Sequence, residues 1–238
     1  MKKLGIIGGA TWHSTALYYE QINRGIAKRL GGIHSASLVI ESLDFADYAA
    51  LQDKGDWAAA DAMIVAAAER LAGAGAEGLL LACNTMHKSA AAIEAVVKLP
   101  LLDIREATAA RIAADGRTRV ALLGSRFTMT EAFARTPYED RGIVFQELTA
   151  GWRAEVDRII YEELVAGRVV RDSQRKLKTL ITELGKQKVQ AIVLGCTELV
   201  LAVDVRANVL PVYDTTAIHS RMAIEWMLRE EEEARAAA

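Results

Sequence analysis

The 238-residue sequence has only two cysteines, Cys83 and Cys196, and only three prolines. It contains no Cys-x-x-Cys pair and no tight cluster of Cys and His, so the ligand spacing of a structural zinc site is absent. Charges of opposite sign nearly cancel, because 29 Lys and Arg residues stand against 31 Asp and Glu residues. This balance provides no basic surface for nucleic acid and no polybasic stretch for a membrane. We therefore predict no metal, no nucleic-acid partner and no membrane partner.

Long apolar runs are also missing. The longest stretch without a charged residue, 4–19, is interrupted by Gly, Thr, Ser and His, whereas a membrane span needs about 20 predominantly apolar residues. Lys2 and Lys3 precede an apolar run that is too short for a signal peptide. These features favour the cytoplasm, where thiols stay reduced. We therefore expect free thiols at both cysteines rather than a disulfide.

The composition that is present, 52% hydrophobic and 25% charged residues, is typical of a globular protein. Short apolar runs that end in glycine alternate along the chain with segments of helical periodicity. This alternation predicts an α/β fold with parallel sheets covered on both faces. The expected strands are 4–7, 37–40, 78–82, 120–123 and 191–194, and the expected helices are 11–30, 57–72, 86–97, 152–166, 173–184 and 218–238.

Three short segments recur in the same order in the two halves of the chain. Residues 3–8 match 119–124, residues 79–85 match 192–197, and residues 99–103 match 210–214. Since the offsets are nearly equal, we predict two pseudo-symmetric, doubly wound lobes that face each other across a cleft. The expected parts are an N-terminal lobe, 1–115, a C-terminal lobe, 116–215, and a C-terminal helix, 216–238, that packs on the first lobe.

Each cysteine follows the end of an expected buried strand, at matching positions of the repeat. Ligands of open α/β sheets bind beyond the carboxyl ends of the strands. Two thiols on opposite sides of one substrate could invert a carbon centre, with one removing a proton and the other delivering one. The alternatives are two buried core thiols, or a zinc site of Cys83, His87, Cys196 and Glu198, which the scattered spacing disfavours.

Four motifs resemble the aspartate/glutamate racemase superfamily of cofactor-independent racemases, over nearly the whole chain. They are Gly8-Gly9-Ala10-Thr11-Trp12 with Ser14-Thr15, Cys83-Asn84-Thr85-Met86-His87, the segment 159–164, and Gly195-Cys196-Thr197-Glu198. The resemblance implies catalysis by Cys83 and Cys196 as acid and base, no cofactor such as pyridoxal phosphate, an amino-acid substrate, and a homodimer of two-lobed subunits.

The resemblance also implies substrate-binding residues. Asn84, Thr85 and Thr197 would meet the α-carboxylate, and Glu198, two residues after the second cysteine, is a further substrate-binding residue. Gly9, Ala10, Thr11 and Gln52 match further binding positions, and Arg153 lies close to the position of a basic residue that aspartate racemases use on the side-chain carboxylate. The chain departs from the pattern at Ala10, where many members carry Met, and at His13, which replaces an acidic residue.

His87 follows Cys83 by one helical turn, so it is a candidate for tuning the pKa of that thiol; an ordinary helix histidine is the alternative. The leading hypothesis is an amino-acid racemase that acts on aspartate, glutamate or a broader range. Racemization of hydantoins or isomerisation of maleate on the same scaffold is an alternative that the Gly-Cys-Thr-Glu motif disfavours. A small-molecule binding or regulatory protein is the non-enzymatic alternative.

Overall fold

The computed structural model describes the backbone of residues 1–236 and the side chains of residues 1–230. The chain forms two compact units. Unit 1 contains Met1–Asp103 and residues 219–236, and unit 2 contains Ile104–Ile218. The chain leaves unit 1 after Asp103 and returns within its last helix, α10 (Thr215–Ala236).

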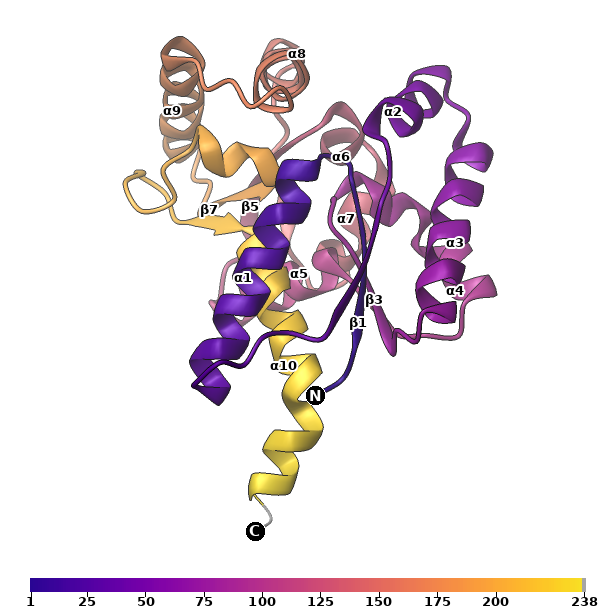
Figure 1. Cartoon of the computed structure of the whole chain (residues 1–238). Coiled ribbons are helices and arrows are strands. Elements are labelled where there is room, and N and C mark those ends of the chain that lie inside the picture. Colours follow the sequence, from indigo (N-terminus) through magenta and orange to yellow (C-terminus); the bar gives the residue numbers. More distant parts are fainter. Residues whose placement is uncertain (237–238) are drawn as a thin grey trace. The chain divides into compact units, whose positions relative to one another are not determined.

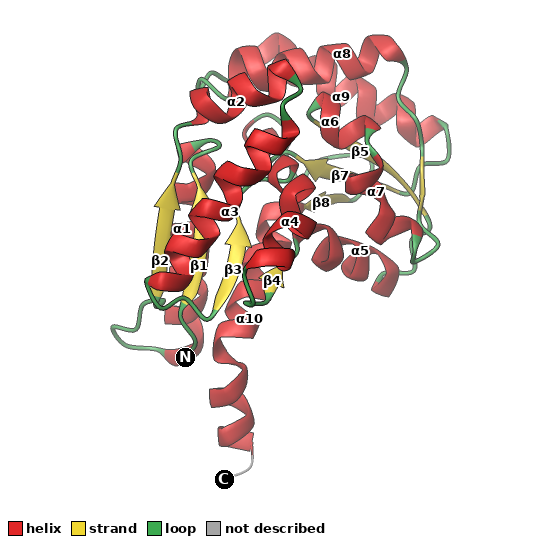
Figure 2. Ribbon diagram, turned by 90° about the vertical axis from the view of Figure 1, so that its right-hand side faces the viewer, coloured by secondary structure: helices red, strands yellow, loops and turns green. Residues whose placement is uncertain are grey.

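Unit 1 is built on a parallel four-stranded sheet of order β2-β1-β3-β4. The strands are β1 (Leu4–Gly8), β2 (Leu38–Ser42), β3 (Gly78–Leu81) and β4 (Leu101–Leu102). The helices are α1 (Trp12–Leu30), α2 (Phe45–Lys54), α3 (Trp57–Gly73), the 3-10 helix η1 (Thr85–Ser89) and α4 (Ala90–Val96). Figure 2 shows α3 and α4 in front of this sheet.

Successive side chains of β1 and β3 enter different cores, because neighbouring residues of a strand point to opposite faces. Ile7, Leu79 and Leu81 pack with α2, α3 and α4. Leu4, Ile6 and Leu80 pack instead with α1 and α10, which run side by side (Figure 1). Because both faces of the sheet are covered, its strands read as nearly continuous apolar runs in the sequence.

Close backbone approach seats α10 on unit 1. A Cβ on Gly78 would lie 2.6 Å from the ring of Trp226, and a Cβ on Gly25 would lie 2.1 Å from Cδ1 of Ile224. The two glycines belong to β3 and α1, so α10 fits closely against both. This contact also anchors the chain beyond the point where it returns from unit 2.

Unit 2 repeats the architecture with strand order β6-β5-β7-β8, again all parallel. Its strands are β5 (Arg119–Gly124), β6 (Val144–Phe145), β7 (Ala191–Gly195) and β8 (Val212–Asp214). Its helices are α5 (Ile104–Ala114), α6 (Arg126–Thr130), α7 (Ala132–Glu139), α8 (Ala150–Arg158), the π-helix η2 (Ile159–Leu164), α9 (Arg171–Lys186) and the 3-10 helix η3 (Thr197–Leu201). The predicted fold class, α/β with two parallel sheets in a repeated arrangement, is confirmed.

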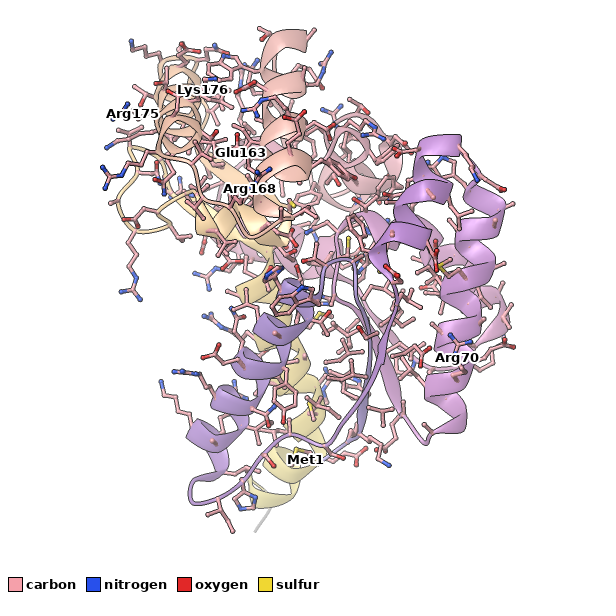
Figure 3. All side chains as sticks on the ribbon, turned by 45° about the horizontal axis from the view of Figure 1, so that its top comes forward. Met1, Arg70, Glu163, Arg168, Arg175 and Lys176 are labelled. Carbon is pink, nitrogen blue, oxygen red and sulfur yellow. The ribbon has the colours of Figure 1, made fainter. Side chains whose placement is uncertain are left out.

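A network of charges ties η2 to α9. The guanidinium of Arg158 donates to Glu155 at 3.0 Å and to Glu163 at 2.9 Å, and the hydroxyl of Ser173 also donates to Glu163 at 2.9 Å. The ammonium of Lys176 donates to Glu155 at 2.9 Å; Figure 3 labels Glu163 on η2 and Lys176 on α9. Hydrogen bonds from Arg158, and secondly from Lys176, lower the pKa of the Glu155 carboxyl to about 2.

Two expected helices are divided in the structure. Segment 152–166 consists of α8 followed by the π-helix η2, and segment 86–97 consists of part of η1 followed by α4. Apolar periodicity is nearly the same in α-, 3-10 and π-helices over a few residues, so the pattern does not reveal a change of hydrogen bonding. The helix α2 was not expected, although Asp44 caps its N-terminus by accepting from the N–H of Ala46.

The sequence-based ranges 1–115, 116–215 and 216–238 stay predictions about domains, because grouping by contact does not test whether a part folds alone. Residues 104–114 group with unit 2, and α10 contributes residues to both units. The last two residues of the predicted C-terminal helix, 237–238, lie outside the described residues.

Candidate active site

Strand order alone marks a binding position in unit 1. The chain moves from β1 to β2 on one side and reaches β3 on the other, so the direction of winding reverses between β1 and β3. In open α/β sheets, ligands bind beyond the carboxyl ends of the strands at this reversal. Gly9, Ala10 and Thr11 follow β1 there, and Cys83, Asn84 and Thr85 follow the end of β3.

Hydrogen bonds fix the loop after β1. The N–H of Gly9 donates to Oγ1 of Thr15 at 2.8 Å, and the Thr15 hydroxyl donates to the carbonyl of Thr11 at 3.2 Å. Oγ1 of Thr11 accepts from the N–H of Ser14 and caps α1. Gly9 adopts a φ of +94°, a conformation that glycine tolerates best. The predicted binding residues Ala10 and Thr11 are therefore held buried in a fixed loop.

Cys83 is partly buried and packs against a cluster that includes Ala10, Tyr48 and Met86. Asn84 and Thr85 are buried at the start of η1. Gln52 lies on α2, one turn after Tyr48, and is 4% exposed.

A buried polar cluster lies behind the Cys83 turn. Nδ1 of His87 is 2.9 Å from the carbonyl oxygen of Cys83, and its Nε2 is 3.9 Å from Oδ1 of Asp103. The ring of His219 is 5.8 Å from that of His87, between centroids. Nε2 of His219 is 2.7 Å from the carbonyl of Leu102, and its Nδ1 is 2.8 Å from the Tyr18 hydroxyl. All of these groups belong to unit 1.

The donor roles in this cluster follow from chemistry, since a carbonyl oxygen only accepts. His87 carries a proton on Nδ1, and His219 carries one on Nε2. When the ring of His219 is neutral, its Nδ1 accepts and the Tyr18 hydroxyl donates. Burial first, and the charge of His87 second, lower the pKa of His219 to about 3 from its ordinary value of 6.5.

This shift predicts a loss of stability in mild acid. Between pH 6.5 and about 3 the unfolded chain binds a proton at His219 that the folded chain does not. The stability that the neutral ring provides is therefore complete above pH 6.5 and falls by up to about 1.4 kcal/mol per pH unit as the pH is lowered through this window.

We expect His219→Gln to reduce the difference between the free energies of unfolding at pH 7 and pH 5, measured with urea. His34→Gln, which removes an exposed histidine, is the matched control. An unchanged difference in the His219 variant would show that His219 takes up its proton equally in the folded and unfolded chains.

Unit 2 has the corresponding reversal between β5 and β7, whose last residues, Gly124 and Gly195, are paired. Cys196 comes directly after Gly195 and is partly buried. Its thiol donates to Oε2 of Glu198 at 3.0 Å, and the hydroxyl of Thr197 donates to the same oxygen at 2.9 Å. Glu198 and Thr197 are 5% and 4% exposed, so the carboxylate is held by two donors away from bulk water.

Arg153, the predicted partner of a substrate carboxylate, lies on α8. Its guanidinium donates to the carbonyl of Leu148 at 3.0 Å and lies 3.8 Å from the carboxylate of Glu147. The side chain is 36% exposed. Its role therefore stays a prediction based on the resemblance.

Sequence reasoning missed the cluster of Tyr18, Asp103 and His219. Asp103 reads as a helix cap, and His219 has no partner that its neighbours in the sequence identify. The only available signal was the repeat, which places Asp103 and Asp214 at equivalent positions. Asp214 does act as a cap and accepts from the N–H groups of Thr216 and Ala217.

Among the residues that the structure describes, no group of three or more Cys, His, Asp and Glu side chains is arranged to hold a metal ion. None of their helices has both the length and the apolar character needed to cross a membrane. A cavity of about 310 Å³ in unit 2 is lined by α9 and by residues 200–208, and it contains none of the predicted site residues.

Comparison with known proteins adds independent findings. Residues 7–223 match the family model described as Asp/Glu/Hydantoin racemase. The chain is 44% identical to a candidate Asp/Glu racemase from Yersinia pestis, with 96% of this chain and 100% of that chain covered and a TM-score of 0.89. It is 32% identical to an aspartate racemase homologue from Pyrococcus horikoshii, with 95% and 99% covered and a TM-score of 0.80. An aspartate racemase from Picrophilus torridus, at 18% identity, 97% and 94% coverage and a TM-score of 0.73, shares the fold.

Proposed function

The chain belongs to the Asp/Glu/hydantoin racemase family, and we propose that it interconverts the L and D enantiomers of an amino acid without a cofactor. The observation that carries this proposal is the position of the two thiols. Each follows the central strand pair of its sheet at the reversal of winding, where an α/β fold binds ligands. A binding protein would need no thiol at either position.

In the proposed reaction, one cysteine thiolate removes the α-proton of the substrate. The electron pair stays on the α-carbon and is delocalised into the carboxyl group. The other cysteine, as a thiol, delivers its proton to the opposite face of that carbon and becomes the thiolate. Cys83 and Cys196 exchange these roles for the mirror-image substrate.

Buried polar groups suit the rest of the substrate. In unit 1, Gln52, Asn84 and Thr85 are neutral and buried. We propose that these residues, with Thr197, bind the α-carboxylate and stabilise the charge that develops on it. Gly9, Ala10 and Thr11 would form the backbone wall of the site, and Arg153 would bind a side-chain carboxylate of aspartate or glutamate.

Proton NMR in deuterated water tests the activity directly. Single enantiomers of the amino acids are incubated with the protein and no added cofactor. We expect the α-proton signal of aspartate, of glutamate or of a wider set to disappear, together with formation of the opposite enantiomer. If no amino acid in the panel exchanged its α-proton, the proposed activity would be wrong.

Because of the resemblance, we also propose that the protein is a homodimer and lies in the cytoplasm. Light scattering during size-exclusion chromatography measures the mass of the assembly. A mass of one chain, 25.9 kDa, at working concentration would contradict the dimer.

A further inference from the structure

The two cysteines have chemically different neighbours. In the first half of the chain, the residue four positions after Cys83 is His87, whereas the equivalent residue after Cys196 is Val200. In the second half, the thiol of Cys196 donates to the carboxylate of Glu198 at 3.0 Å. The two halves of the chain therefore match in their strands and cysteines, but they differ in the side chains that influence the protonation of each sulfur.

The surroundings of His87 favour a positive ring. Its Nδ1 donates to the carbonyl of Cys83, so a neutral ring would point the lone pair of Nε2 toward the Asp103 carboxylate. A proton on Nε2 replaces this repulsion with an ion pair at 3.9 Å. The neighbouring ring of His219 stays neutral, because burial above all lowers its pKa to about 3. The positive charge of this buried cluster therefore belongs on His87.

The backbone next to Asp103 is held in place by His219. His219 donates to the carbonyl of Leu102, the residue before Asp103, at 2.7 Å. The rings of Tyr18 and His219 also meet edge to face, with centroids 5.6 Å apart. Tyr18 and His219 are fully buried, and they fix the backbone that carries the carboxylate of Asp103.

His87 is bonded to the residue that carries the first sulfur. The carbonyl that accepts from its Nδ1 at 2.9 Å belongs to Cys83 itself, whose oxygen and sulfur are joined through the same Cα. Asp103 faces the ring from Nε2, on the other edge. A nearby positive charge favours a thiolate over a thiol.

Cys196 meets the opposite condition. Its S–H donates to Oε2 of Glu198, which also accepts from Thr197. Loss of the thiol proton would break this hydrogen bond and leave two negative groups 3.0 Å apart. A like charge at this distance disfavours ionisation of the sulfur.

We propose that the resting protein holds Cys83 as the thiolate and Cys196 as the thiol, with Asp103 as the positioning residue of His87. The catalytic meaning of this assignment rests on the proposed function: Cys83 is the base of the first turnover. A C–H bond of the substrate breaks, an S–H bond forms on Cys83, and the S–H bond of Cys196 breaks as its proton reaches the substrate. Each turnover therefore ends with the two protonation states exchanged.

Alkylation measures the ionisation of each cysteine in the absence of substrate. The intact protein is treated with iodoacetamide between pH 5 and pH 9, and the rate at each cysteine is read from peptide masses. Only the thiolate reacts, so the pH at the midpoint of each rate profile reports the ionisation of that cysteine. The accessibility of the sulfur changes the rate at every pH by the same factor and does not move the midpoint. We expect the midpoint of Cys83 to lie at least about one pH unit below that of Cys196. Equal midpoints, or a lower midpoint for Cys196, would overturn the assignment.

Variants test the partners. Asp103→Asn should raise the midpoint of Cys83 by about one unit and leave that of Cys196 unchanged. Asp214→Asn is the matched control, because it removes the carboxylate at the equivalent position of the repeat and should shift neither midpoint. An unchanged Cys83 midpoint in Asp103→Asn, or the same shift in both variants, would remove Asp103 from this role.

Glu198→Gln should lower the midpoint of Cys196, and it tests the second half of the assignment even if Asp103→Asn does not fold. A midpoint of Cys196 that does not fall in this variant would contradict the role of the carboxylate. Because no substrate is present, these results are independent of the exchange assay. Separated midpoints together with no exchange of any amino acid would reject the proposed function and retain the protonation assignment.

Discussion

Replacement of either cysteine by alanine is expected to lower the rate of racemization by about 10²–10⁴-fold, the contribution of one positioned acid or base. This corresponds to about 3–5 kcal/mol of barrier. Inversion needs one proton removed from one face and one delivered to the other, so neither Cys83 nor Cys196 suffices alone. The rate is measured by following each enantiomer with chiral chromatography.

The two variants serve as controls for each other, because each retains one thiol. The remaining thiolate can remove the α-proton only from the enantiomer that presents this proton to it, and it can return a deuteron to the same face. We therefore expect each variant to exchange the α-proton of a single enantiomer much faster than it inverts that enantiomer, and the two variants to select opposite enantiomers. Wild-type rates of racemization in both variants would refute the two-base mechanism.

Gly9→Ala is expected to destabilise the protein by about 3 kcal/mol or more and to abolish activity. Gly9 has a φ of +94°, and a Cβ at this position would lie 2.0 Å from the carbonyl oxygen and 2.4 Å from the nitrogen of Leu43. Both clashing atoms are backbone, so no side-chain rotation relieves them. The loop that carries Ala10 and Thr11 would have to move.

Gly116→Ala is the matched control for backbone strain alone. Gly116 also has a positive φ, +69°, but nothing lies within 4 Å of its Cβ position. This variant should lose only about 1–2 kcal/mol, the cost of a left-handed conformation for a residue with a Cβ. Urea unfolding compares the two variants. Equal losses of stability would show that the contact with Leu43 contributes nothing.

The sequence predicted the longer strands of the two sheets but missed the short strands β4, β6 and β8. The runs 4–7, 120–123 and 191–194 lie within β1, β5 and β7. Strands buried on both faces need an unbroken apolar run, and such a run is visible in any single sequence. The π-helix η2 and the 3-10 helix η1 were missed because their hydrogen bonding leaves no mark in the apolar periodicity.

The candidate site divides in the same way. The positions of Cys83 and Cys196 after the central strands could be predicted, since a strand end and the residue that follows it are local features. Their use in catalysis stays a prediction. The charged residues around the two cysteines could be predicted only in part. Glu198 is two residues from Cys196 and was visible in the motif, whereas Asp103 reaches His87 only through the packing of β4 beside β3.

By itself, the sequence determined the α/β alternation, the two-fold repeat and the placing of one thiol after a central strand in each half, because all three are written in apolar runs and short motifs. Only the tertiary structure decided which polar groups meet in the interior. Tyr18 and His219 are 201 residues apart in the chain, and nothing near either of them specifies the other. Their pairing arises because α10 returns to pack on the same sheet face as α1, where a buried polar atom must find its hydrogen-bond partner among whatever side chains that packing brings within reach.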